Sequence, residues 1–383
     1  MKKLVGLLVA ALLAAPAAAT AQVKIGVINS MTGPQAPIGE SLTNGMKLAQ
    51  EDLAKKGVKV DLVWEDDTGK PDKALSALDK LATRDNVVGV VGPYTSACAN
   101  AVGQRMPDYE LPLLVPAAAK SQITKPGNEW TFRLNAPDTY YASSLIDGTL
   151  SLGKPKTMAI LYENTDFGTS VGKAAKDIAA AKGLQVVFEE AYSQGSPDYR
   201  STLTKVKGAN PDLVFMVSYV ADAILLMRQA REMGLKPQAF LGGGAGFDTA
   251  QFENEKEISA YVFSTTQWTV DVNAATSKDF AKRYQDKFGK KPTYHAACAY
   301  EAMMIMGQTA AKAGGDRKKT RDGLASGSWN GILGDVKFQA FDGYKNQNKL
   351  AMPVTQYLDG KSQTVFPEAY RTAKPVYPFP GWK

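Results

Sequence analysis

Residues 87–106 read VVGVVGPYTSACANAVGQRM. Residues 87–91 form an apolar run, which is typical of a strand in a buried parallel sheet. Residues 92–96 join this strand to a helix expected over about 96–106. A strand that turns directly into a helix is the repeating unit of α/β folds, so this stretch predicts the fold class.

The junction at residues 92–96 is also the first candidate ligand site. In open α/β sheets, ligands bind beyond the carboxyl ends of the strands. Tyr94, Thr95 and Ser96 stand at that position, at a helix start whose unpaired N–H groups attract a carboxylate. Ser96 has a second possible role, because a serine at this place can simply cap its own helix. The local sequence leaves both roles open.

The strand and helix alternation extends outward from this stretch in both directions. Repeated βα units predict parallel sheets with helices on both faces. A polar bridge before residue 157 separates two such runs, which predicts two similar α/β lobes. The less regular last third is expected to return and complete both lobes. Strands are expected over residues 23–28, 58–64, 87–91, 111–115, 157–162, 186–190, 213–217, 240–241, 261–264, 331–338 and 350–357, and helices over 39–55, 71–83, 96–106, 167–181, 198–206, 221–233, 277–288 and 296–313.

The N-terminus has the order of a secretory signal peptide. Lys2 and Lys3 precede an apolar run over residues 4–15, Pro16 follows, and small residues stand at 19–21. The apolar run is shorter than the roughly 20 residues that span a membrane. We therefore expect cleavage after Ala21 and a periplasmic mature protein without a membrane span.

Charge and size narrow the class of protein further. The chain has 45 Lys and Arg against 38 Asp and Glu, and its charges are scattered, which argues against nucleic-acid binding. A mature chain of this length is too large for one compact core, which again favours two domains. Cys98 and Cys298 are the two cysteines, and the sequence leaves open whether they form a disulfide or remain buried thiols.

The chain has no complete set of catalytic or metal-binding residues. His295 is the single histidine. The Gly-x-Ser-x-Gly match at residues 168–172 lies within the helix expected over 167–181 rather than at a strand-to-helix turn, so a serine hydrolase triad is not expected. There is no Cys-x-x-Cys and no histidine pair for zinc. The glycine-rich residues 242–246 lack the Gly-Lys-Ser/Thr of a phosphate loop and are interpreted as a tight turn. We predict a protein that is not an enzyme and uses no cofactor or metal.

The whole mature chain resembles the leucine/isoleucine/valine-binding protein family. The resemblance depends on the order and spacing of several short motifs rather than on one of them. These are Ile25-Gly26-Val27, Ser30 to Pro34 with Gly39, Asp66-Asp67 before Pro71, residues 92–96, residues 113–119, Phe167-Gly168, and residues 228–234.

The resemblance implies two Rossmann-like lobes with parallel sheets, joined by a three-segment hinge, with a ligand trapped between them. It implies a first lobe of residues 22–137 plus about 269–342 and a second lobe of 138–268 plus about 343–383. Ser96 aligns with a serine that holds the ligand carboxylate, and Ala117 with a backbone carbonyl that accepts the ligand ammonium. Phe167 and Tyr219 align with second-lobe aromatics that close over the ligand, and Ile38 with a packing position.

Two departures from the family pattern concern the ligand ammonium. Ala119 stands where the family usually has a hydroxyl, and Gly244 stands near its glutamate. Asp248 or Asp222 are possible replacements for that carboxylate. A buried ammonium without an acidic partner is strongly disfavoured. Trp268, near an expected hinge crossing, is either a flat wall of the site or a packing residue of the hinge.

The expected function is that of a monomeric solute-binding component of an ABC importer, which delivers a small carboxylate to an inner-membrane permease. The site chemistry favours an aromatic or aliphatic acid without an α-ammonium, and the family favours a branched-chain amino acid. The alternative is a sensory ligand-binding lobe that reports to a membrane partner. An exported enzyme is the third possibility, and it lacks a catalytic set.

Overall fold

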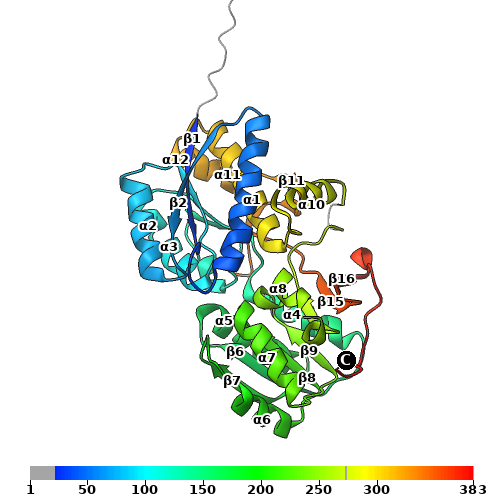
Figure 1. Ribbon diagram of the computed structural model, residues 1–383. Coiled ribbons are helices and arrows are strands. Elements are labelled where there is room, and N and C mark those ends of the chain that lie inside the picture. Colours follow the sequence, from blue (N-terminus) through cyan, green and yellow to red (C-terminus); the bar gives the residue numbers. More distant parts are fainter. Residues whose placement is uncertain (1–21, 272–273, 383) are drawn as a thin grey trace, which may run out of the picture.

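The computed structural model describes residues 22–271 and 274–382 and contains two α/β lobes, one above the other in Figure 1. The predicted signal peptide and its cleavage after Ala21 lie outside the described residues. Each lobe has a seven-stranded sheet with helices packed on it. The strands of each sheet come from distant parts of the chain, so neither lobe is one continuous segment.

The first lobe is built on a sheet with the strand order β13-β14-β5-β4-β3-β1-β2. Its central strands are parallel, and β13 runs antiparallel to β14 at the edge. The elements are β1 Val23–Asn29, α1 Ala36–Lys55, β2 Val60–Asp66, α2 Pro71–Thr83, β3 Gly89–Val91, α3 Ser96–Tyr109, β4 Leu113–Val115, β5 Thr131–Arg133, α10 Ala274–Phe288, α11 Tyr294–Lys312, α12 Arg317–Ser326, β11 Trp329–Gly331, β12 Gly334–Val336, β13 Phe338–Phe341 and β14 Tyr344–Asn348.

The second lobe repeats this plan with the order β16-β15-β10-β9-β8-β6-β7. Here β15 is antiparallel to both of its neighbours. The elements are α4 Asp138–Leu150, β6 Thr157–Glu163, α5 Asp166–Ala181, β7 Gln185–Tyr192, α6 Arg200–Ala209, β8 Leu213–Val217, α7 Val220–Glu232, β9 Ala239–Gly242, α8 Ala250–Asn254, α9 Lys256–Ser259, β10 Phe263–Thr265, β15 Val354–Leu358 and β16 Lys361–Phe366.

The chain crosses between the lobes three times, after β5, after β10 and after β14. The third crossing differs from the sequence-based expectation of about residue 342. Strand β14 (Tyr344–Asn348) pairs with β5 in the first sheet, so the crossing follows Asn348. The expected single strand over 331–338 is also wrong, because Gly334, at φ +81°, begins the second arm of the β11–β12 hairpin.

Both sheets bring equivalent loops to the interface between the lobes. In each sheet the strand order reverses at one point, between β1 and β3 in the first lobe and between β6 and β8 in the second. Loops at such a switch point diverge beyond the carboxyl ends of the strands and leave room for a ligand. The fold therefore predicts a site where the loops after β3 and β8 meet.

Candidate functional site

A small cavity lies between the lobes, and the space between its lining atoms, including the part open to solvent, is about 210 Å³. The loops after β3 and β4 and the start of α11 line it from the first lobe, and the loops after β6, β8 and β9 together with α4 line it from the second. Its lining is five aromatic rings, four alanines and one serine. These residues are Tyr94, Ser96, Ala117, Ala118, Ala119, Tyr141, Phe167, Tyr219, Ala245 and Tyr294.

Thr95, rather than Ser96, caps helix α3. The Thr95 hydroxyl accepts a hydrogen bond from the N–H of Cys98 at 3.3 Å. The hydroxyl of Ser96, the first helical residue, instead accepts from the N–H of Lys120 at 3.3 Å and remains able to donate. In the described part of the chain, the N–H groups of Ser96 and Ala97 have no partner. The cavity thus has free donors at a helix N-terminus.

The loop after β3 can take this course because Gly92 passes very close to β1. Its φ is +122°, and a Cβ there would lie 2.0 Å from the carbonyl oxygen of Ile28. Arg133 fixes the neighbouring loop after β4, because its Nη1 donates to the carbonyls of Ala119 (2.8 Å) and Lys120 (2.7 Å). The loops after β3 and β4 are therefore fixed by contacts with β1 and with Arg133, on the side away from the cavity.

Aromatic rings of the second lobe close the other side of the cavity. The ring centroid of Tyr219 lies 5.5 Å from that of Phe167 and 5.9 Å from that of Tyr94, across the lobe interface. Phe167 also contacts Tyr141, with centroids 6.2 Å apart. Such edge and offset contacts are the favourable geometries for aromatic pairs. A flat or branched apolar group would find ring faces on several sides here.

A buried carboxyl group supports Tyr219. Glu163 accepts a hydrogen bond from the N–H of Tyr219 at 2.9 Å and another from the hydroxyl of Thr165 at 2.8 Å. Burial raises the pKa of Glu163 to about 8. Since Glu163 does not line the cavity, it acts on a ligand only by holding the backbone that carries Tyr219.

Part of the ammonium-binding set expected from the family is missing from the cavity. The carbonyl oxygen of Ala117 accepts a hydrogen bond from Asn135 Nδ2 at 2.5 Å and keeps a second lone pair. Gly244 has φ +76°, and a Cβ there would lie 2.5 Å from the ring of Tyr141, so the position excludes a carboxylate side chain. Asp222 and Asp248 do not line the cavity either. Among the described residues, none with a charged side chain lines the cavity.

Three further expected site residues lie outside the cavity lining. Ile38 lines an adjoining pocket at the mouth of the interface, described below. Trp268 packs its ring against Phe280, with centroids 5.6 Å apart, and donates from Nε1 to Ser277 at 3.0 Å. Trp268 is thus a packing residue beside the hinge and not a wall of the cavity. Thr95 acts through its cap of α3.

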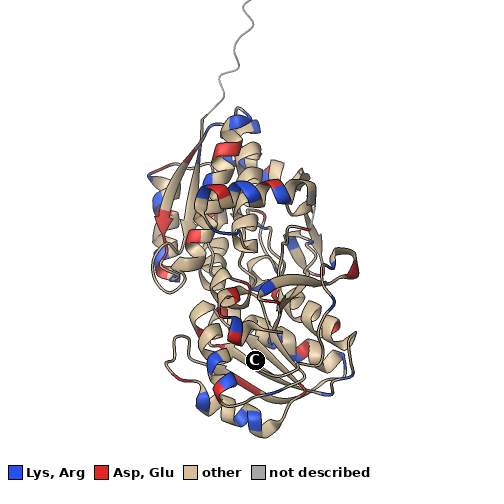
Figure 2. Cartoon of the chain, turned by 45° about the vertical axis from the view of Figure 1, so that its right-hand side comes forward, with Lys and Arg blue, Asp and Glu red and all other residues tan. Residues whose placement is uncertain are grey.

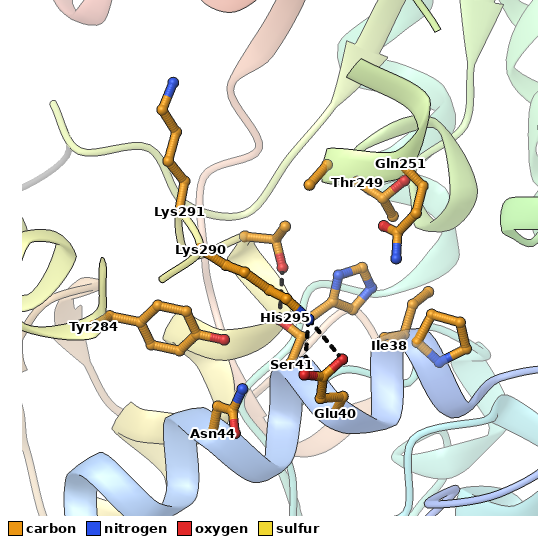
Figure 3. A pocket seen from close by; sticks show the side chains of 13 residues that line it. Ile38, Glu40, Ser41, Asn44, Thr249, Gln251, Tyr284, Lys290, Lys291 and His295 are labelled. Atoms are coloured by element: carbon orange, nitrogen blue, oxygen red, sulfur yellow. Dashed lines mark hydrogen bonds and ion pairs between the residues drawn. The ribbon is translucent and has the colours of Figure 1, made fainter. Parts of the chain in front are cut away.

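The mouth pocket has an empty volume of about 450 Å³ and lies between α1, the start of α11 and α8 (Figure 3). An ion pair between Glu40 and Lys290 (2.8 Å) and a contact between Ser41 and Thr293 (3.1 Å) tie its first-lobe walls together. Its lining residues are Pro37, Ile38, Glu40, Ser41, Asn44, Thr249, Ala250, Gln251, Tyr284, Lys290, Lys291, Thr293 and His295.

Sequence reasoning missed Tyr141, Tyr294 and His295 near this interface. Tyr141 lies on α4, a helix in the supposed polar bridge, and Tyr294 and His295 begin α11. Tyr294 also joins the lobes, because its hydroxyl accepts from the N–H of Ala245 at 3.3 Å.

Thiols, metal-binding clusters, membrane spans and charged patches were the other candidate features in the described part of the chain. Cys98 and Cys298 are buried free thiols. The described residues contain no His, Cys, Asp and Glu cluster able to hold a metal ion, and none of the described helices is long and apolar enough to cross a membrane. Lys and Arg are interspersed with Asp and Glu over both lobes (Figure 2).

Two α/β lobes with a shared interlobe cavity are the architecture of a bilobal solute-binding protein. Residues 22–361 match the model of the periplasmic binding protein family, so the chain belongs to that family. The resemblance to the leucine/isoleucine/valine-binding proteins is confirmed. A relative from Brucella melitensis, the Leu/Ile/Val-binding protein homolog 7, is 30% identical, covering 96% of this chain and 97% of the relative.

Solved structures agree with the fold. The branched-chain amino acid transporter substrate binding protein LivJ from Streptococcus pneumoniae, in complex with isoleucine, has a TM-score of 0.81 at 24% identity, covering 89% of this chain and 97% of that one. An ABC transporter solute binding protein from R. palustris, in complex with benzoate, has a TM-score of 0.81 at 20% identity. The match covers 90% of this chain and 95% of that one. At these identities the similarity establishes the fold alone.

Proposed function

We propose that the chain is the solute-binding component of an ABC importer and captures one small carboxylate between its lobes. In this proposal the signal peptide is cleaved after Ala21, and the mature protein works as a monomer in the periplasm. It delivers its solute to a permease in the inner membrane. Family membership and the buried interlobe cavity support this role, and its relatives are binding proteins rather than enzymes.

The carboxylate binds at the N-terminus of α3. Ser96 presents a hydroxyl that can donate, and the free N–H groups of Ser96 and Ala97 stand beside it. These groups lie at the N-terminus of a 14-residue helix, which is the positive end of the helix dipole. They are the single observation that carries the proposal, because nothing else in the lining attracts an ion.

The rest of the solute is apolar and carries no ammonium. Among the described residues no Asp or Glu lines the cavity, and Gly244 cannot hold a side chain, so a buried ammonium would have no acidic partner. The aromatic rings of Tyr141, Phe167 and Tyr219 suit a flat acid of the benzoate type. A branched-chain amino acid is the second candidate, since the similar LivJ structure holds isoleucine.

Capture couples to lobe closure. A solute that contacts Ser96 in the first lobe and Tyr219 in the second binds the closed form better than the open form. It therefore shifts the population toward the closed form. The permease is expected to recognise that form.

A thermal-shift screen of the purified mature protein tests the proposal. The panel holds benzoate-type acids, aliphatic monocarboxylates and the amino acids leucine, isoleucine and valine. A true solute at 100 times its Kd adds about 2.7 kcal/mol of stability and raises Tm by several degrees. Stabilisation by a monocarboxylate supports the proposal, whereas no stabilisation by any carboxylate of the panel contradicts it.

A further inference from the structure

Two polar groups at the lobe interface have no hydrogen-bond partner although they are buried. The hydroxyl of Tyr94 and both ring nitrogens of His295 are unpartnered among the described residues. Tyr94 is 4% exposed and His295 0%. Buried polar groups are nearly always paired, because an unmade hydrogen bond inside a protein is costly.

The two groups lie next to each other. The rings of Tyr94 and His295 meet edge to face with centroids 5.6 Å apart, and His295 stacks on Tyr294 at 3.8 Å. Tyr94 and Tyr294 line the buried cavity, and His295 lines the mouth pocket. Tyr94 and His295, hereafter the Tyr94–His295 pair, thus stand between the two spaces.

Packing alone does not account for a histidine here. A phenylalanine would stack on Tyr294 equally well and would leave no nitrogen unpaired. In Figure 3 the imidazole lies beside the side chains of Ile38 and Gln251, which line the same pocket from opposite lobes. His295 lines the mouth pocket while its ring contacts Tyr94 of the buried cavity, so it is placed to meet a bound molecule that extends from one space into the other.

The chemistry of the pair selects an uncharged group. Burial lowers the pKa of His295 to about 3, so the ring is neutral near pH 7 and offers one donor and one acceptor. Burial raises the pKa of Tyr94, so its hydroxyl keeps its proton. Of the cations at the mouth, Lys290 is paired with Glu40, and the ammonium of Lys291 points away from His295 in Figure 3. A second carboxylate would therefore find no counter-charge at the pair.

We propose that the Tyr94–His295 pair is a polar subsite that binds a hydroxyl group of the solute, so that hydroxylated aromatic monocarboxylates are preferred over the unsubstituted acids. This inference rests on the proposed capture of an acid in the same cavity. A hydroxyl both donates and accepts, which matches a neutral imidazole beside a phenol.

Calorimetry with benzoate and with 2-, 3- and 4-hydroxybenzoate tests the inference. We expect at least one isomer to bind the parent protein about tenfold more tightly than benzoate, the gain of one well-formed hydrogen bond. His295→Phe keeps the stacking on Tyr294 and should reduce this ratio to about one or two. Tyr94→Phe removes a single oxygen and should also lower the ratio. Ser76→Ala, which removes an exposed hydroxyl on α2, should keep it.

The outcomes separate the two proposals. If benzoate binds and no isomer is preferred, or if both the His295→Phe and Tyr94→Phe variants retain the full preference, the subsite is overturned while the capture of acids stands. If neither benzoate nor any hydroxybenzoate binds, the proposed aromatic acid is wrong, and the subsite falls with it.

Discussion

Lys120 Nζ lies 2.6 Å from Asp166 Oδ2, and this ion pair joins the first lobe to the start of α5 in the second. The backbone N–H of the same lysine donates to the hydroxyl of Ser96. One residue therefore connects the expected carboxylate site with the contact that holds the lobes together.

Removing this pair should weaken solute binding modestly. Asp166→Asn removes the charge at a partly exposed site, where an ion pair contributes about 0.2–1 kcal/mol, so we expect affinity to fall by up to about fivefold. Calorimetry at low and high salt measures the effect, and the difference from the parent should shrink at high salt. Asp177→Asn, which breaks the exposed Lys173–Asp177 pair on the same helix, is the control. An equal loss in both variants would rule out a role in closure.

Ser96→Ala should weaken binding by about 1.5–3 kcal/mol, the contribution of a hydrogen bond to a charged group. Its stability should fall as well, because the N–H of Lys120 loses the Ser96 hydroxyl as its acceptor, although the cap of α3 by Thr95 stays in place. Thr95→Ala should lower stability by about 0.5–2 kcal/mol through loss of the cap and should leave the Ser96 hydroxyl available to the solute. Calorimetry and thermal melting separate the two effects. Unchanged affinity in Ser96→Ala means that the carboxylate binds elsewhere.

Gly244→Ala should destabilise the protein more than an ordinary glycine replacement does. The position combines φ +76° with a Cβ site 2.5 Å from the ring of Tyr141, and backbone strain of this kind costs about 1–3 kcal/mol. Gly183→Ala is the matched control, since Gly183 also has φ +76° and a Cβ there meets nothing within 4 Å. Equal melting temperatures for the two variants would show that the contact with Tyr141 does not matter.

Glu163 should make stability depend on pH. Its pKa rises on folding from 4.5 to about 8, so the folded chain binds this proton more tightly than the unfolded chain. The resulting stabilisation is complete below about pH 4.5 and is lost as the pH rises toward 8. Glu163→Gln should flatten the stability profile over this range. A variant profile parallel to that of the parent would show that Glu163 does not titrate as described.

The sequence predicted most of the parallel strands, because buried parallel strands are continuous apolar runs, but the three-residue strand β5 was not expected. It missed β14, whose residues Tyr344–Asn348 look polar. There, Gln347 is fully buried and accepts from Arg133 Nε at 2.6 Å, a partner more than 200 residues away. Helix α4 was missed for a related reason, since its mixed polar and aromatic residues show little amphipathic pattern. Tertiary contacts of this kind leave no local periodicity.

The cavity was predictable in part. Tyr94, Ser96, Phe167 and Tyr219 all lie two to five residues after a strand, so the switch-point argument and the family resemblance both indicated them. Tyr141 and Tyr294 reach the cavity from helices, and their approach depends on how the lobes meet. Trp268 was ambiguous in sequence because packing and ligand contact use the same residue type.

The most direct test of the proposed function is a calorimetric titration of the mature protein, purified free of bound solute, with benzoate and with leucine under identical conditions. The cavity offers donors for a carboxylate and aromatic faces for a ring but no carboxylate for an ammonium. We therefore expect benzoate to bind at least tenfold more tightly than leucine, which corresponds to about 1.4 kcal/mol. Tighter binding of leucine, with an acidic side chain found on its ammonium, would contradict this account of the site.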